Sequence, residues 1–245
     1  MIDEKRPFVA HLKELRDRLV VSIIAVGIAF VITYNFKEYL FQFLMQPFIA
    51  VMPTGSSFIF TSITEAFLTY FKISIVAALF IASPVLLYEI WMFVAPGLYE
   101  KEKRYIYPFI FFGSLLFIMG GLLCYYIVMP YIYRFFVSYA TEFVVPMPAL
   151  RDYMNLTLKL LIIFGLIFQL PLLAYYLARA GIITHKLLSS KRRYAILGIF
   201  VLSAVITPPE LMSQLLMVVP LYGLYEVSIV IAKVFGKKES KDAAA

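Results

Sequence analysis

Long runs of apolar residues alternate with short charged segments along the whole chain. The first run, residues 19–36, holds eighteen residues without a charge, and later runs are as long or longer. About 20 apolar residues in an α-helix are enough to cross the hydrocarbon core of a membrane. The pattern therefore predicts an all-α polytopic membrane protein with six transmembrane helices, over residues 19–36, 66–94, 105–133, 153–177, 194–207 and 211–232.

The predicted helices differ in length. The third is uncharged over residues 105–133 and exceeds the length that a span needs, so we expect it to tilt or protrude. Only sixteen uncharged residues separate Arg193 from Glu210, roughly 24 Å of helix at 1.5 Å per residue. The turn Thr207-Pro208-Pro209-Glu210 joins the fifth and sixth helices into a hairpin, and we expect this short pair to thin the bilayer locally.

Basic residues alternate between the connections and indicate the orientation. Most of the 22 Lys and Arg residues lie in four segments: before residue 19, at 101–104, at 179–193 and after 232. Because cytoplasmic loops carry an excess of Lys and Arg, both termini are predicted in the cytoplasm. We expect one membrane domain over residues 1–245, with a cytoplasmic tail at 234–245.

Composition agrees with the membrane class and excludes several kinds of site. The chain is 62% hydrophobic and 15% charged, whereas soluble domains are nearer half apolar and a quarter charged. Its net charge of +7 indicates contact with anionic membrane lipid rather than with nucleic acid, because the basic residues flank the predicted spans. The single Cys124 and the distant His11 and His185 indicate neither a disulfide nor a metal site. No HExxH, GxSxG or P-loop motif predicts catalysis or a cofactor.

Two connections on the outer side are substantial, although neither resembles a folded domain. Residues 37–65 begin with an amphipathic stretch that predicts an interfacial helix, broken at Pro47. Residues 134–152 are rich in aromatic residues and contain Pro146 and Pro148.

Two acids stand among bases on the predicted cytoplasmic face: Glu14 in HLKELRDR and Glu102 in YEKEKR. Carboxylates in such a setting can bind a guanidinium from a partner. The alternative for Glu14 is a helical pair with Arg18, four residues later, which contributes only a few tenths of a kcal/mol when exposed. The alternative for Glu102 is a solvated loop charge.

Polar residues within the spans have two interpretations each. Gln169, two residues before Pro171, can bond a helix of another protein or the backbone that the proline leaves unpaired. Lys72 and Lys159 either extend to the outer interface or mark a hydrated cavity. Glu226, near the cytoplasmic end of the sixth span, can meet a base at the interface.

These segments together resemble one family, TatC, the core membrane subunit of the twin-arginine protein translocase. The resemblance covers nearly the whole chain and includes HLxELRxR and the long stretch ASPVLLYEIWMFVAPGLYEKEKR. It continues in CYYIVMP, FGLIFQLP and TPPELMSQ, at residues 124–130, 164–171 and 207–214.

The resemblance implies a fold and a function. The family fold is a concave bundle, and its members receive signal peptides bearing Arg-Arg and help to export folded proteins with the proton-motive force. Matched position by position, the family's signal-peptide-binding residues are Glu14, Arg16, Phe93, Glu102 and Arg104. Glu14 and Glu102 would bind the two guanidiniums, Phe93 an apolar neighbour, and Arg16 and Arg104 would order the acids.

The resemblance also implies partners and a location. The partners are the single-span TatA and TatB proteins, further copies of the chain and membrane lipid, in a bacterial or archaeal cytoplasmic membrane. Gln169 occupies a position where the family often has Glu, so a charged contact there is in doubt while hydrogen bonding to a partner helix remains.

Two other classes compete on generic features. A small secondary transporter or channel would show an inverted repeat and broken helices at the midplane, and neither is evident. A membrane enzyme would show clustered catalytic groups, and the sequence contains no such motif.

Overall fold

The computed structural model describes residues 8–53, 57–94, 106–141, 146–206 and 211–236. These residues are almost entirely helical and contain no strand, apart from one isolated bridge between Ile59 and Ala149. The all-α class is therefore confirmed. The chain divides into two compact units, residues 1–44 with 60–115 and residues 45–59 with 116–245.

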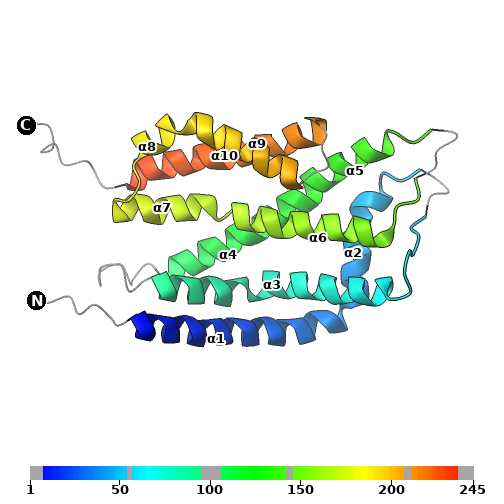
Figure 1. Cartoon of the computed structure of the whole chain (residues 1–245), viewed down its shortest axis with the longest axis horizontal. Helices are drawn as coiled ribbons and strands as arrows, with labels where there is room; N and C mark the ends of the chain where they lie inside the picture. Colours follow the sequence, from blue (N-terminus) through cyan, green and yellow to red (C-terminus); the bar gives the residue numbers. More distant parts are fainter. Residues whose placement is uncertain (1–7, 54–56, 95–105, 142–145, 207–210, 237–245) are drawn as a thin grey trace, which may run out of the picture. The chain divides into compact units, whose positions relative to one another are not determined.

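The first unit is built on two antiparallel helices, α1 (Phe8–Asn35) and α3 (Glu65–Val94), which lie side by side in Figure 1. Ala29 packs against Ala78 and Ala82, and Thr33 donates a hydrogen bond to the Ser74 carbonyl at 2.8 Å. Small side chains allow the two backbones to approach closely, as is common between membrane helices.

Glu65, the first residue of α3, binds the turn that leads into the helix. The Glu65 carboxylate accepts hydrogen bonds from the backbone N–H groups of Thr61 and Ser62 at 2.7 and 3.1 Å. These bonds hold the preceding turn against the start of the helix, where a negative charge is also favourable.

Helix α2 (Lys37–Ile49) follows α1 after a bend of 80°. The predicted break at Pro47 is wrong, because the helix continues through this residue to Ile49. A proline removes one backbone donor, and here it does so only two residues before the helix ends.

The second unit contains the remaining helices. Helix α4 (Ile106–Leu123), which begins in the first unit, continues through a π-helical turn, η3 (Cys124–Val128), into α5 (Met129–Val137). Helices α6 (Leu150–Ile167) and α7 (Leu170–Ala180) form one interrupted span, followed by α8 (His185–Ser190), α9 (Arg192–Ile206) and α10 (Leu211–Phe235).

An aromatic cluster fixes one end of the second unit. Phe48, Phe58, Tyr133 and Tyr153 lie with ring centroids 5.1 or 5.2 Å apart, an arrangement typical of packed aromatic pairs. Beside it, Ile59 exchanges backbone hydrogen bonds with Pro148 and Leu150. The two long connections are therefore paired at this point.

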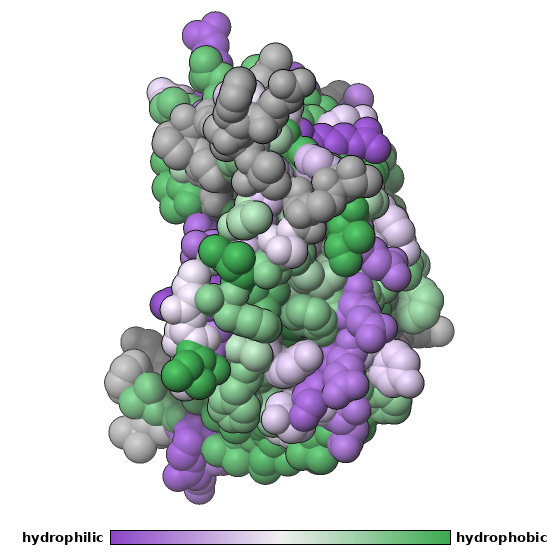
Figure 2. Space-filling model, turned by 90° about the vertical axis from the view of Figure 1, so that its right-hand side faces the viewer, coloured by the Kyte–Doolittle hydropathy of each residue, from purple (hydrophilic) through white to green (hydrophobic). Residues whose placement is uncertain are grey.

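Four described helices are long and apolar enough to cross a membrane, and the bent pair α1–α2 makes a fifth. Helix α9, with 15 residues, is below that length, so the count of six spans stays a prediction. Helix α10 has 25 residues and extends to Phe235, so the expectation of a short sixth helix is wrong. In Figure 2, broad hydrophobic areas surround several smaller groups of hydrophilic side chains.

Candidate functional site

The first predicted site residue, Glu14, lies near the start of α1 and binds a guanidinium within the chain. Arg18 donates from Nε and Nη2 to the same Glu14 oxygen, Oε1, at 3.3 and 2.9 Å. Because residues four apart share one side of a helix, α1 itself sets this geometry. The helical pair expected as the alternative for Glu14 is thus present.

A second carboxylate binds the same guanidinium from the neighbouring helix. Arg18 Nη1 donates to Glu89 Oε2 at 3.1 Å, and Glu89 comes from the last third of α3. The side chains of Arg18 and Glu14 are each 21% exposed and that of Glu89 only 10%, so the three charges are largely screened from water. The ion pairs should therefore be stronger than fully exposed ones.

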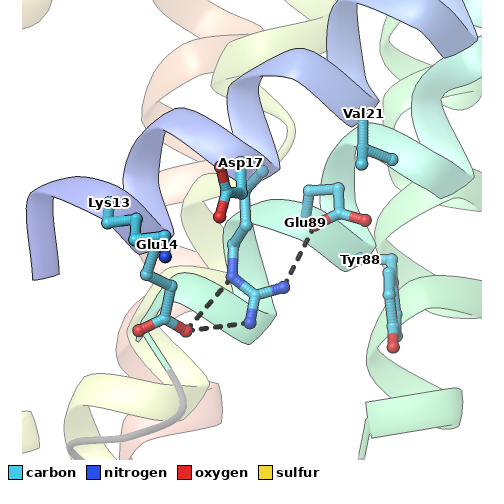
Figure 3. Close-up of a pocket in the computed structure, with 7 residues that line it drawn as sticks. Lys13, Glu14, Asp17, Val21, Tyr88 and Glu89 are labelled. Atoms are coloured by element: carbon cyan, nitrogen blue, oxygen red, sulfur yellow. Dashed lines mark hydrogen bonds and ion pairs between the residues drawn. The ribbon is translucent and has the colours of Figure 1, made fainter. Parts of the chain in front are cut away.

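These residues line an open pocket of about 530 Å³ on the first unit. Figure 3 shows Glu14 and Glu89 approaching the guanidinium from two sides, with Tyr88 beside Glu89. The lining residues are Lys13, Glu14, Asp17, Arg18, Val21, Tyr88 and Glu89. This set contains three carboxylates, and two of them, Glu14 and Glu89, share the one guanidinium of Arg18.

Arg16 and Phe93 are the other described residues of the predicted signal-peptide site. Arg16 donates to Asp17 Oδ1 from Nη2 at 2.7 Å, and both side chains are more than half exposed. Arg16 therefore pairs with Asp17, which itself lines the pocket. Phe93 is half-buried and lies one helical turn after Glu89, on the same side of α3.

Glu102 and Arg104 lie outside the described residues. On either side of residues 95–105, α3 and α4 are joined by a ring contact between Trp91 and Phe109, whose centroids are 4.6 Å apart. Both rings are buried. This contact holds the last turn of α3 against the first turn of α4.

Glu89 is the site residue that sequence reasoning missed. In the sequence it stands as a single acid near the end of the second predicted span, 66–94. A carboxylate inside an apolar run is costly unless it is paired, and this cost is the signal that could have identified it. Its partner could not be read from spacing, because Arg18 is 71 residues earlier in the sequence.

Gln169 lies in the second unit, at the break between α6 and α7, two residues before Pro171. Its side chain is buried, with 9% exposure for the residue. Little of its surface is therefore presented to another protein, which favours a role within the chain. The predicted contact with a partner helix stays a prediction.

The other polar residues of the second unit bind within the chain. Lys159 Nζ donates to the Val205 carbonyl in the last turn of α9, at 3.1 Å. Arg192 donates to both oxygens of Glu226 at 2.7 and 2.8 Å, so Glu226 does meet a base. The hydrogen bond to Glu226 raises the pKa of Arg192. Among the described residues, no group of three His, Cys, Asp or Glu could hold a metal ion.

Residues 10–220 match the family model described as Sec-independent protein translocase protein (TatC). This match spans most of the chain. The chain belongs to the TatC family.

Relatives and solved structures agree with the TatC assignment. The Sec-independent protein translocase protein TatC of Desulforapulum autotrophicum is 47% identical over 98% of this chain and 89% of its own length. That of Haemophilus influenzae is 38% identical over 99% and 94%. A crystal structure of the twin arginine translocase receptor TatC covers 91% of this chain and 98% of its own, with 39% identity and a TM-score of 0.81.

Membership in the TatC family fixes the general role. The chain is a multi-pass membrane protein, a core subunit of the Tat translocase and a member of the Tat complex. It is a translocase component and not an enzyme.

Proposed function

We propose that this TatC-family protein is the receptor for twin-arginine signal peptides and the core of a translocase that exports folded proteins with the proton-motive force. Glu14 and Glu102 would each bind one guanidinium of the signal peptide, and Phe93 would contact an apolar neighbour. Arg16 would act through Asp17, while Arg104 would order Glu102.

The observation that supports this proposal most is the guanidinium already bound by Glu14. Arg18 donates from two nitrogens to one oxygen of Glu14, Oε1, so this carboxylate already accepts one edge of a guanidinium. The planar guanidinium of an arginine can bind both oxygens of a carboxylate with two parallel N–H···O hydrogen bonds. The ammonium group of a lysine, a point charge, cannot reproduce this arrangement. The same chemistry would select arginine over lysine in a signal peptide.

The test is peptide binding to the full chain in lipid nanodiscs. A signal peptide with Arg-Arg is compared with its Lys-Lys version on wild-type protein and on Glu14→Gln and Glu102→Gln. A hydrogen bond to a charged group contributes about 1.5–3 kcal/mol, so each substitution should weaken Arg-Arg binding roughly 10- to 100-fold.

Glu38→Gln is the matched control, because Glu38 is an exposed acid in the first turn of α2. It should bind both peptides as the wild type does. Equal binding of Arg-Arg and Lys-Lys peptides, unchanged in Glu14→Gln and Glu102→Gln, would refute the receptor assignment.

We also propose that TatA- and TatB-type single-span proteins dock along α9, with further copies of this chain and lipid around them. Leu197, Val201 and Val205 lie four residues apart on α9 and are all more than half exposed. Such an apolar ridge suits a helix of a partner. The location proposed is the cytoplasmic membrane with both termini in the cytoplasm, and Gln169 would reach a partner only if the α6–α7 break opened.

Replacing the ridge tests the docking site. Val201→Asn should reduce co-purification of the TatB-type partner, whereas Val230→Asn on α10, at an equally exposed position, should not. Equal co-purification with both variants would exclude α9 as the site.

A further inference from the structure

Arg18 binds its two carboxylates with different edges of the guanidinium. Nε and Nη2 form the edge toward Glu14, while Nη1 points to Glu89. The guanidinium has five N–H donors in a fixed plane, so one edge can release its partner while the other keeps its own. The contact with Glu89 therefore does not depend on the contact with Glu14.

Losing one ion-pair partner costs a partly buried charge much free energy only when no second partner remains beside it. Arg18, 21% exposed, would be left with an unpaired charge if Glu14 were taken from it and nothing else were near. Glu89, at 3.1 Å and 10% exposed, removes that cost. An arginine held by two acids can thus give up one of them.

We propose that Arg18 is an internal stand-in for a signal-peptide arginine, and that Glu89 is the residue that receives it when the peptide binds. An incoming guanidinium takes the place of Arg18 on Glu14, and Arg18 remains on Glu89. Glu89 is then a positioning residue of the receptor site. This inference rests on the proposed function, because it assumes that Glu14 binds the peptide.

The charges of the pocket agree with the exchange. With Arg18 in place, the lining has three carboxylates and two cations. Asp17 is already paired with Arg16. Glu14 and Glu89, in contrast, share the single cation Arg18. A second guanidinium on Glu14 would leave each of these two acids with one cation, without expelling Arg18. The pocket beside the ion pairs, about 530 Å³ and open, provides room for the arriving side chain.

The competing explanation is that Arg18 only joins α1 to α3. The two explanations predict opposite signs. If Arg18 competes for Glu14, its removal raises the affinity for the peptide, because the acceptor is no longer occupied. If Arg18 only holds the helices together, its removal leaves the affinity unchanged or lowers it.

The experiment measures binding of the Arg-Arg peptide to the full chain in nanodiscs for wild type, Arg18→Gln, Glu89→Gln and the double variant. A competitor that occupies Glu14 for about nine-tenths of the time lowers apparent affinity about tenfold, so Arg18→Gln should bind about tenfold tighter. Glu89→Gln should bind several-fold more weakly, because Arg18 then has only Glu14. The double variant should bind the peptide as tightly as Arg18→Gln does, because Arg18 is no longer present to compete for Glu14.

Arg192→Gln is the matched control, since Arg192 also binds a glutamate between two helices, but in the other unit. It should leave peptide affinity unchanged. If Arg18→Gln does not fold, Arg18→Lys replaces it, because a lysine cannot bind both acids with separate edges. This variant should show a smaller gain in affinity.

The outcomes separate this inference from the proposed function. Wild-type preference for Arg-Arg that requires Glu14, together with unchanged or weaker binding in folded Arg18→Gln and Arg18→Lys, overturns the exchange alone. Absence of any preference for Arg-Arg in the wild type overturns the receptor function and the exchange together.

Discussion

Tyr133 and Thr157 form a buried hydrogen bond between α5 and α6. The two hydroxyl oxygens are 2.6 Å apart, and Thr157 also donates to the Tyr153 carbonyl at 2.8 Å. A threonine hydroxyl has one hydrogen, so Tyr133 is the donor to Thr157. The direction of the bond follows from the count of donors.

Tyr133→Phe removes this donor and should destabilise the protein by about 1–2 kcal/mol, because Tyr133 and Thr157 are both fully buried. Thermal unfolding of the purified protein in detergent should show a lower midpoint. Tyr131→Phe is the control, since Tyr131 is half exposed on the same helix. Equal midpoints for the two variants would contradict a stabilising hydrogen bond between Tyr133 and Thr157.

At this scale the sequence predicts contacts within a helix and misses those between helices. The spacing of Glu14 and Arg18 predicts their ion pair, which is present. The partner of Glu89 depends on the register of α1 against α3, which small residues such as Ala29 and Ala78 set. No local pattern encodes that register, so the second acid of the pocket could not be read from the sequence.

At the scale of elements, two glycines bring α4 and α6 together. A Cβ at Gly120 would lie 2.5 Å from the Phe164 carbonyl oxygen, and one at Gly165 would lie 2.8 Å from the Phe117 ring. Neither added Cβ atom would fit unless the neighbouring atoms moved. The two helices therefore pack at a distance that only glycine permits.

Gly120→Ala should destabilise the protein by about 1–3 kcal/mol, since the added methyl group meets backbone rather than a movable side chain. Gly27→Ala on α1 is the control, because nothing lies within 4 Å of its Cβ position. There alanine should leave stability unchanged or raise it, by up to about 1 kcal/mol, through helix propensity. Unfolding midpoints in detergent compare the two, and a midpoint for Gly120→Ala at or above the wild type would contradict the close approach.

Hydrophobic runs predict where the helices lie, but they do not predict the residue at which each helix ends. Helix α10 extends to Phe235, past its expected end at residue 232, and the charge inside it, Glu226, is paired with Arg192. Helix α2 passes Pro47 because one missing hydrogen bond near a helix end costs little. Both corrections depend on contacts or context that a hydropathy pattern does not contain.

At the scale of the whole molecule, the orientation in the membrane is the main expectation to test. The only cysteine, Cys124, is fully buried, so new cysteines can be labelled over a low background. Ser57 and Ser190 are exposed and lie in connections predicted on opposite sides.

In intact cells, an impermeant maleimide should label Ser57→Cys, and should label Ser190→Cys only after the membrane is opened. The reason is the excess of Lys and Arg around residue 190, which keeps that connection in the cytoplasm. The wild type, with Cys124 alone, is the control and should stay unlabelled. The reverse pattern would place both termini outside.

Composition and charge pattern were sufficient for the class of this protein but not for its assembly into units. Ile59 pairs with the backbone of Leu150, Phe48 packs against Tyr133, and Phe58 packs against Tyr153. Each contact joins segments about 90 residues apart, and each depends on how the intervening helices fold back.

The π-helical turn at Cys124–Val128 has a consequence for insertions and deletions. Such a turn usually accommodates one extra residue in an α-helix without rotating the flanking turns relative to each other. Deleting Ile127 should convert the turn to ordinary α-helix and leave Tyr133 facing its cluster. Deleting Ile118 within α4 instead rotates everything on one side of the gap by about 100°. Over evolutionary time, this turn is where the helix can lose a residue and keep its partners.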